Sequence, residues 1–410
     1  MPTDQQAIRI QAHEDQLVVG LSQAEQVLEI LGEIPVSWSS VEKNSALKLA
    51  LLTVDSVTVP EGFTDENKAG LDLLISYLRK TFRNKYGSDL TIGKNRIVGS
   101  ITGSPYTGGG IKRPLPYTGG GIKRPLPYTG GGENNPTPDT GSDSQGIQPA
   151  SGDSLPKRKE LPGQGVRVGI LDTRIFAHPD LAGRYLASHG TLASEVQDRL
   201  PGQDAHATFI AGVVLQRAPD ADLLVDHVLD EDDIATSSWK VATRMVRFAD
   251  AGVSALNVSF GAATDDDQPP LVLARAVEVL TEKGVIVVAA AGNNGPSARP
   301  IWPAALPEAV AVGAGQVEST GAFKAAGFSP NAKWVELMAP GEDIWSTYRS
   351  NGYATWNGTS FAAAAVSGAI AFLVQTQRIS PANAVKQLKT SLTARAPSSA
   401  DAVIADIGPR

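Results

Sequence analysis

From about residue 161 to the C-terminus, short apolar runs alternate with longer stretches in which apolar residues recur at helical spacing. The length and β-branched content of the short runs predict buried strands, and the longer stretches predict helices. Strands that alternate with helices in this way predict an α/β fold, with a parallel central sheet covered by helices on both faces. The predicted strands are Val166–Leu171, Asp222–Val228, Ala255–Phe260, Val285–Ala290 and Ala309–Gly313, and the predicted helices are His206–Leu215, Ser238–Ala251, Leu271–Lys283, Ser360–Gln377 and Ala382–Leu392.

The first 100 residues carry a second, shorter pattern. Ser22 precedes apolar positions at helical spacing, which predicts a helix Ser22–Leu31 with Ser22 as its N-cap. Asp65–Tyr86 has an apolar stripe that is typical of a long helix. The order strand, helix, strand, strand, helix, strand predicts a small α/β domain over residues 1–100. The strands are expected at Ile8–Ile10, Leu17–Leu21, Val36–Val41, Leu47–Val54 and Ile97–Ile101.

Between these two regions, residues 101–160 have the composition of a flexible linker. An 11-residue sequence spans Pro105–Leu115 and is repeated at Pro116–Leu126, and Glu133–Gly152 is rich in Pro, Ser and Gly. Such a segment has too few apolar residues to bury a core of its own. We therefore expect three parts: a domain 1–100, a linker 101–160 and a main domain 161–410.

Composition narrows the function classes. The net charge of −7 argues against a nucleic-acid partner, and the absence of cysteine excludes disulfides and thiolate chemistry. No stretch is predicted to span a membrane. The N-terminus lacks a signal-peptide pattern, so a cytoplasmic location is expected, or secretion if the chain is a trimmed precursor.

Four polar residues follow predicted strands or open predicted helices, where function sits in open parallel sheets. Asp172 ends a buried strand, and His206 and Ser360 each begin a helix. Asn293 follows the strand Val285–Ala290. Each residue alone is more typical of a turn, a helix cap or a packed side chain. Together they offer an acid, a base, a nucleophile and an amide donor.

The stretches that carry these residues resemble the subtilisin-like serine protease family, over about residues 161–395. The order Asp, His, Ser is that of the family. The matching stretches are Gly-Ile-Leu-Asp-Thr (169–173), His-Pro-Asp-Leu (178–181), His-Ala-Thr-Phe-Ile-Ala-Gly (206–212), Asn-Val-Ser-Phe-Gly (257–261), Ala-Ala-Ala-Gly-Asn (289–293), Ala-Val-Gly-Ala (311–314), Met-Ala-Pro-Gly (338–341) and Asn-Gly-Thr-Ser (357–360).

The resemblance implies a serine endopeptidase that acts on protein or peptide substrates through an acyl-enzyme. Ser360 would attack the scissile carbonyl, His206 would transfer the proton, and Asp172 would orient His206. Asn293 would stabilise the oxyanion together with the Ser360 backbone N–H. The expected substrate-binding residues are Ser259, Phe260 and Gly261, as a strand edge, and Ala290, Ala291 and Gly292, as a pocket lining.

Departures from the family pattern keep an alternative open. Arg174 stands where glycine is usual and would compete with His206 for Asp172, and Phe209 replaces a histidine as an expected core residue. A pseudoprotease, or a peptide-binding scaffold with an N-terminal adaptor domain, is the alternative function. An α/β-hydrolase is rejected, because Ser360 comes last in the chain and lacks the Gly-x-Ser-x-Gly context.

The resemblance also implies a role for residues 1–100. Family members often carry a prodomain of this element order, so the N-terminal domain is an expected partner in cis, regulated by cleavage of the linker. No cofactor and no metal are expected to be required; a structural calcium ion is conceivable, but no calcium-loop pattern indicates one. The acidic runs Asp230–Asp233 and Asp265–Asp267 are consistent either with a preference for basic residues before the cleaved bond or with solvated acidic loops.

Overall fold

The structure is a computed structural model that describes part of the chain. The predicted strand Ile8–Ile10 and nearly all of the predicted linker lie outside the described residues. The described residues are 12–66, 68–100, 137–138, 165–188, 191–193, 205–229, 235–317, 323–348 and 352–393.

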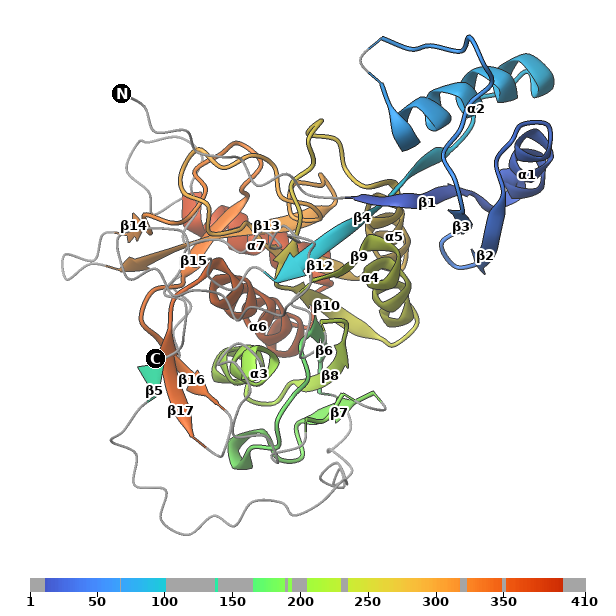
Figure 1. Cartoon of the computed structure of the whole chain (residues 1–410). Coiled ribbons are helices and arrows are strands. Elements are labelled where there is room, and N and C mark those ends of the chain that lie inside the picture. Colours follow the sequence, from blue (N-terminus) through green and yellow to red (C-terminus); the bar gives the residue numbers. More distant parts are fainter. Residues whose placement is uncertain are drawn as a thin grey trace, which may run out of the picture.

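The N-terminal unit is an antiparallel sheet with two helices on one face (Figure 1). Its elements are β1 (Ala12–Gly20), α1 (Ala24–Gly32), β2 (Trp38–Asn44), β3 (Leu49–Val54), α2 (Gly70–Tyr86) and β4 (Ile92–Ser100). The strand order β4-β1-β3-β2 places β1 in the interior, where alternate residues face opposite sides. Leu17 and Val19 pack with α1 and α2, whereas Val18 joins the core of the C-terminal part. The predicted element order is confirmed.

Ser22 is not the N-cap of α1, contrary to the sequence prediction. It lies in a 3-10 turn, and Gln23 precedes the helix without capping it. The Gln23 side chain instead bonds to the backbone of Asp89 and Thr91, at 2.8 and 2.9 Å. The side chain next to the start of α1 thus binds the segment before β4 and does not cap the helix. Three further predicted boundaries are wrong by five residues: β1 begins at Ala12 rather than Leu17, α2 at Gly70 rather than Asp65, and β4 at Ile92 rather than Ile97.

The C-terminal part is built on an 8-stranded, mostly parallel sheet. Its strands in spatial order are β14 (Phe323–Ala325), β13 (Ala309–Val317), β12 (Ile286–Ala290), β10 (Val253–Val258), β6 (Arg167–Asp172), β8 (Asp222–His227) and β7 (Tyr185–Ala187), with β15 (Leu337–Pro340) beside β13. Its helices are α3 (His206–Arg217), α4 (Ser238–Met245), α5 (Leu271–Glu282), α6 (Thr359–Gln377) and α7 (Pro381–Thr393).

Helices cover both faces of this sheet, as predicted. Val287 of β12 packs in the cluster that contains residues of α4 and α5, and the adjacent Val288 packs in the cluster that contains residues of α6. This alternation follows from the two-residue period of a strand, and it explains why the parallel strands are apolar throughout.

Helix α6 is the core helix of the C-terminal part. Apolar residues surround its axis, which is typical of a helix with no solvent-facing side. A side chain at Gly368 would meet the Val214 carbonyl at 2.7 Å, so glycine permits the close packing of α6 on α3. By length and composition, α6 is the one described helix that could cross a membrane, but 78% of its most apolar stretch is buried in the fold, as expected of a core helix.

Three local predictions differ from the structure. The predicted strand Ala255–Phe260 is interrupted at Ser259, so β10 is followed by a separate short strand β11 (Phe260–Gly261). Helix α4 ends at Met245 and continues only as a 3-10 turn. Within the predicted linker, two residues form strand β5 (Thr137–Pro138). This strand pairs with β17 (Tyr353–Trp356), which in turn pairs with β16 (Ile344–Thr347).

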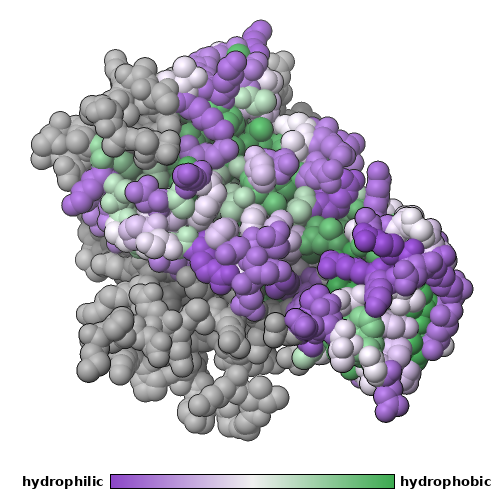
Figure 2. All heavy atoms as spheres, turned by 90° about the horizontal axis from the view of Figure 1, so that it is seen from above, coloured by the Kyte–Doolittle hydropathy of each residue, from purple (hydrophilic) through white to green (hydrophobic). Residues whose placement is uncertain are grey.

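Figure 2 shows the polarity of one face of the molecule. On the face seen in Figure 2, hydrophilic residues predominate and apolar ones occur in scattered patches. Among the described residues, the exposed large apolar side chains are Trp38, Trp345 and Phe372. Isolated apolar side chains of this kind are ordinary on a protein surface.

Candidate active site

The predicted site residues come together at one edge of the parallel sheet. Asp172 is the last residue of β6, and His206 is the first residue of α3. Ser360 is the second residue of α6, and Asn293 follows the end of β12. All four side chains are at most 1% exposed.

Asp172 and His206 form a buried pair. The imidazole Nδ1 lies 2.6 Å from Asp172 Oδ1, which also accepts a hydrogen bond of 2.8 Å from the Thr173 backbone N–H. Because a carboxylate can only accept, Nδ1 carries the proton and Nε2 of the neutral ring is the basic nitrogen. The competition for Asp172 that the sequence suggests for Arg174 stays a prediction.

Threonine hydroxyls hold the start of α3 against the segment that follows β6. Thr173 Oγ1 accepts a hydrogen bond of 3.0 Å from the Ala207 N–H, in the first turn of the helix. Thr208 Oγ1 accepts one of 2.8 Å from the Phe176 N–H. These contacts fix His206 relative to Asp172, because they join the two segments that carry them.

Thr359 orients the amide of Asn293. Asn293 Oδ1 accepts hydrogen bonds of 2.8 Å from both the Thr359 backbone N–H and its hydroxyl. A backbone N–H must face an acceptor, so this contact identifies the oxygen end of the amide and directs the NH2 group away from Thr359. The NH2 group is the end that an oxyanion would need.

A buried chain of polar side chains ties the start of α6 to β10. Ser367 Oγ donates to Asn257 Oδ1 at 3.1 Å, and Asn257 Nδ2 donates to Ser259 Oγ at 3.0 Å. Ser259 Oγ in turn lies 3.5 Å from the Ser360 carbonyl oxygen. The sequence analysis quoted the stretch 257–261 but gave no role to Asn257, Ser367 or Thr359, because only the tertiary contacts show what they bind.

The two groups that would exchange a proton are both unsatisfied. Ser360 Oγ and His206 Nε2 are buried and have no hydrogen-bond partner among the described residues. Buried polar atoms are rarely left in this condition, and a catalytic role is one explanation for those that are. Catalytic hydrogen bonds are often long before substrate binds and shorten in the reacting complex.

The groove beside this site is filled by β4 of the N-terminal unit. On one side, Ser100 pairs with Phe260 and Gly99 with Gly261, antiparallel to β11. On the other side, β4 is antiparallel to β9 (Ala235–Ser237), and Val98 is opposite Thr236. β4 is therefore the middle strand of three, in the position that an extended peptide would take on this strand edge.

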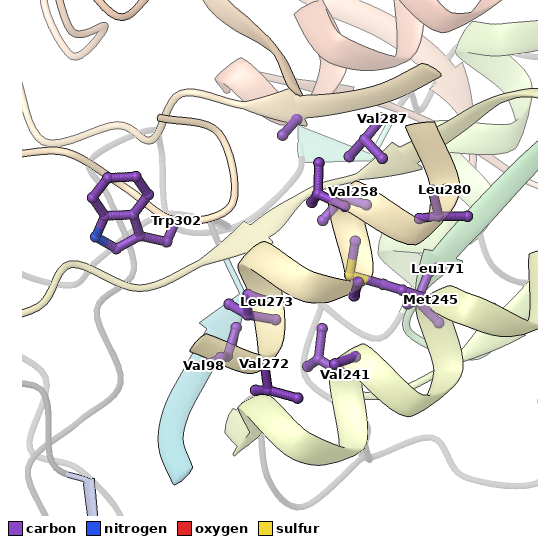
Figure 3. Packing of buried hydrophobic residues seen from close by; sticks show 14 of the residues in the cluster. Val98, Leu171, Val241, Met245, Val258, Val272, Leu273, Leu280, Val287 and Trp302 are labelled. Carbon is purple, nitrogen blue, oxygen red and sulfur yellow. The ribbon is translucent and has the colours of Figure 1, made fainter. Parts of the chain in front are cut away.

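Val98 of β4 is fully buried by residues of the C-terminal part. It belongs to the same apolar cluster as Val241 of α4 and Val272 and Leu273 of α5, and Figure 3 shows it beside Leu273. The groove thus offers an apolar site to a side chain of the strand that occupies it. Phe260 and Gly261 form this edge and Ser259 directly precedes it, and the role of all three in substrate binding stays a prediction.

Ala290, Ala291 and Gly292 lie directly before Asn293 and are buried. The Gly292 N–H donates to Thr359 Oγ1 at 3.1 Å, so this segment is fixed against the start of α6. Gly292 has φ of +96°, which L side chains rarely adopt, and a Cβ there would lie 3.1 Å from Ile301.

The structure describes only one of the two acidic runs, Asp265–Asp267. Residues 230–234 lie outside the described part. In the other run, Asp267 pairs with Arg299 at 2.9 Å, and Asp266 lies 3.6 Å from Arg96 of β4. The preference for basic residues stays a prediction. In the part of the chain that is described, no group of three or more His, Asp or Glu side chains could hold a metal ion.

Comparisons with known proteins show which family the chain resembles. Residues 163–403 match the model of the subtilase family, peptidase S8. Subtilisin BL of Lederbergia lenta is 35% identical over 245 residues, which are 57% of this chain and 86% of that protein. Thermitase of Thermoactinomyces vulgaris is 32% identical over 233 residues, which are 54% of this chain and 78% of that protein.

A solved structure resembles the whole chain. Fervidolysin from Fervidobacterium pennivorans, a keratinolytic enzyme related to subtilisin, aligns with a TM-score of 0.62 and covers 100% of this chain and 62% of its own. Its sequence identity is 18%, so this likeness concerns the fold alone.

Proposed function

The chain belongs to the subtilase family of serine endopeptidases, and from that premise we propose that Ser360, His206 and Asp172 are its nucleophile, general base and orienting carboxylate. The observation that carries this proposal is the 2.6 Å contact between Asp172 and His206, both fully buried, at the sheet edge where α6 presents Ser360. The substrates of this family are proteins or peptides.

In the first step, His206 Nε2 takes the proton of the Ser360 hydroxyl while Oγ forms a bond to the carbonyl carbon of the peptide. The imidazolium then donates that proton to the leaving amine, the C–N bond breaks and an acyl-enzyme remains. A water molecule then attacks the acyl-enzyme, with His206 again as the base, and the acyl part of the peptide is released as a carboxylic acid. Asp172 stabilises the imidazolium and keeps its Nδ1–H oriented.

The negative oxygen of each tetrahedral intermediate needs donors that are in place before the reaction. Asn293 is suited to this role, because Thr359 holds its oxygen and leaves its NH2 group directed elsewhere. The Ser360 N–H at the start of α6 is the second proposed donor, and the positive end of the helix dipole adds to it. Apart from the peptide and water, the proposed reaction uses only groups of the protein.

The N-terminal unit is proposed as an internal inhibitor and folding aid. The support is the position of β4, which fills the strand edge that a substrate would use. The contact continues beyond the groove: Val18, Leu49 and Leu51 share an apolar cluster with residues of α4 and α5, and Arg275 Nε donates to the Leu47 carbonyl at 3.2 Å. Activation would follow cleavage within residues 101–160.

Activity and the triad are tested with a fluorophosphonate probe and a peptide library. We expect the probe to label Ser360, and expect Ser360→Ala and His206→Ala to abolish both labelling and turnover. Ser360→Ala should lower turnover by roughly 10⁶-fold, the loss known for subtilisin, a relative of this chain. Labelling at another serine would contradict the assignment, and a folded, unlabelled protein that only binds peptides would favour the pseudoprotease alternative.

The role of the N-terminal unit is tested with the two parts of the chain produced separately. Residues 161–410 produced alone should fold poorly, and added residues 1–100 should restore folding and then inhibit turnover. In the full chain, intact mass and N-terminal sequencing should show cleavage between residues 101 and 160 that Ser360→Ala prevents. If residues 161–410 fold readily and ignore residues 1–100, a tethered adaptor domain is the better description.

A further inference from the structure

Aromatic rings surround the imidazole of His206. Its centroid lies 5.6 Å from the Trp356 ring, at an interplanar angle of 84°, and 5.6 Å from the Phe361 ring, at 50°. Phe209 touches both of these rings, with centroids 5.6 Å from Trp356 and 4.5 Å from Phe361. Each of the four side chains is at most 1% exposed.

The rings come from α3, which carries the proposed base, from α6, which carries the proposed nucleophile, and from β17, which precedes α6. Phe209 lies three residues after His206 on α3, one turn further along. Trp356 ends β17, four residues before Ser360, and Phe361 directly follows Ser360 on α6. The cluster therefore joins the helix that carries the base to both sides of the nucleophile.

Hydrogen bonding alone does not fix the imidazole. Within the described residues, the polar contact of the ring is the single bond from Nδ1 to Asp172, while Nε2 has no partner. A ring held at one atom can still tilt about that atom, and Nε2 on the far side then moves by the largest amount. Contacts against the ring surface remove this freedom, because packed aromatic side chains leave no space for the tilt.

From these contacts we infer that Trp356 and Phe361 are positioning residues that hold His206 Nε2 toward Ser360. Phe209 packs against both rings. The inference rests on the proposed function of His206 as the general base. A misplacement of about 1 Å at a reacting group lowers turnover by roughly 10²-fold, so loss of either ring should reduce kcat substantially. KM should stay unchanged, because none of these rings is proposed to bind the peptide.

The test compares variants of the full chain after activation. Phe361→Leu and Trp356→Leu should each lower kcat by roughly 10- to 100-fold at unchanged KM. Trp356→Phe keeps an aromatic ring and should retain most of the activity. The matched control is Phe248→Leu, the same change in the separate apolar cluster under α4 and α5, which should lower the melting temperature and leave kcat unaltered.

A spectroscopic readout separates positioning from stability. In the full chain, the Nδ1–H proton that His206 shares with Asp172 should give a far-downfield NMR signal, which broadens in Trp356→Leu and stays sharp in Phe248→Leu. The inference is overturned if Phe361→Leu and Trp356→Leu keep wild-type kcat, or if they lose only stability. If Phe361→Leu does not fold, the comparison of Trp356→Leu with Trp356→Phe tests the inference. If His206→Ala stays active, the proposed function of His206 as the general base is wrong. This result differs from retained activity in the Trp356 and Phe361 variants, which would overturn only the positioning role.

Discussion

The side-chain oxygen of Asn95, in the N-terminal unit, accepts a hydrogen bond of 2.9 Å from the Trp239 backbone N–H in the first turn of α4. The same oxygen accepts one of 3.0 Å from the Ser238 hydroxyl, and Asn95 is 1% exposed. The first N–H groups of a helix have no partner within it. One unit of the protein thus caps a helix of the other, three residues before the strand position that fills the groove.

Asn95→Ala should weaken inhibition by the N-terminal unit. The change leaves buried donors of α4 unsatisfied, at a cost of about 1–3 kcal/mol, or roughly 5- to 150-fold in inhibition constant. Inhibition of the activated enzyme by added residues 1–100 measures this. Asn95→Asp keeps an acceptor at the helix N-terminus and should inhibit nearly as well as wild type. Equal weakening by both variants would contradict the capping argument.

Val98→Asp should weaken the binding of β4 in the groove more than Asn95→Ala does. Val98 is fully buried among apolar residues, and an unpaired carboxylate in such a site costs several kcal/mol. We expect inhibition to weaken by at least ~100-fold, measured as basal turnover of the full chain before cleavage. Val98→Ala, which only removes two methyl groups, should have a smaller effect. Unchanged basal activity in Val98→Asp would show that β4 is not what blocks the site.

Asn293→Leu should lower kcat by about 10²–10³-fold with little change in KM, the loss known for the oxyanion-hole asparagine of subtilisin, a relative of this chain. The donor is needed for the oxyanion of the intermediate and not for the substrate carbonyl. Steady-state kinetics on a peptide substrate give both constants. Asn294→Leu is the control at the neighbouring position, and an equal loss there would point to a general disturbance of the loop.

Thr359→Val should lower kcat by about 10-fold, because it removes the hydroxyl that bonds to Asn293 Oδ1 but keeps the backbone N–H that also does so. Thr359→Ser retains the hydroxyl and should restore the activity. If Thr359→Val and Asn293→Leu are combined, the losses should not add, since both act on the same amide. Fully additive losses would indicate that Thr359 acts independently of Asn293.

Stability at alkaline pH should depend on Tyr185. Burial raises its pKa from 10.0 to about 12, and its hydroxyl has no partner among the described residues. The unfolded chain therefore loses the phenolic proton first, so this contribution to stability is complete below pH 10.0 and disappears as the pH rises towards about 12. In a Ser360→Ala background, Tyr185→Phe should flatten the fall of stability over that range. An identical pH profile would refute this.

The sequence by itself determined the order of the elements and singled out the candidate reactive groups. Apolar runs and helical spacing are local properties, so they predicted the strand β12 and the helix that Ser360 opens, with boundaries close to those observed. Short motifs around Asp172 and His206 indicated the chemistry, because each motif combines a reactive side chain with the turn or helix start that presents it. Phe209 was correctly expected to be a core residue.

Only the tertiary structure decided what these groups touch. The bond between Asn293 and Thr359 joins residues 66 positions apart, and β4 pairs with strands whose residues follow it by well over a hundred positions. Such contacts depend on how the sheet and helices pack, and no local period records them. The predicted N-cap at Ser22 was wrong for the same reason. The adjacent Gln23 binds the backbone of Asp89 and Thr91, and this long-range contact was not visible in the local pattern.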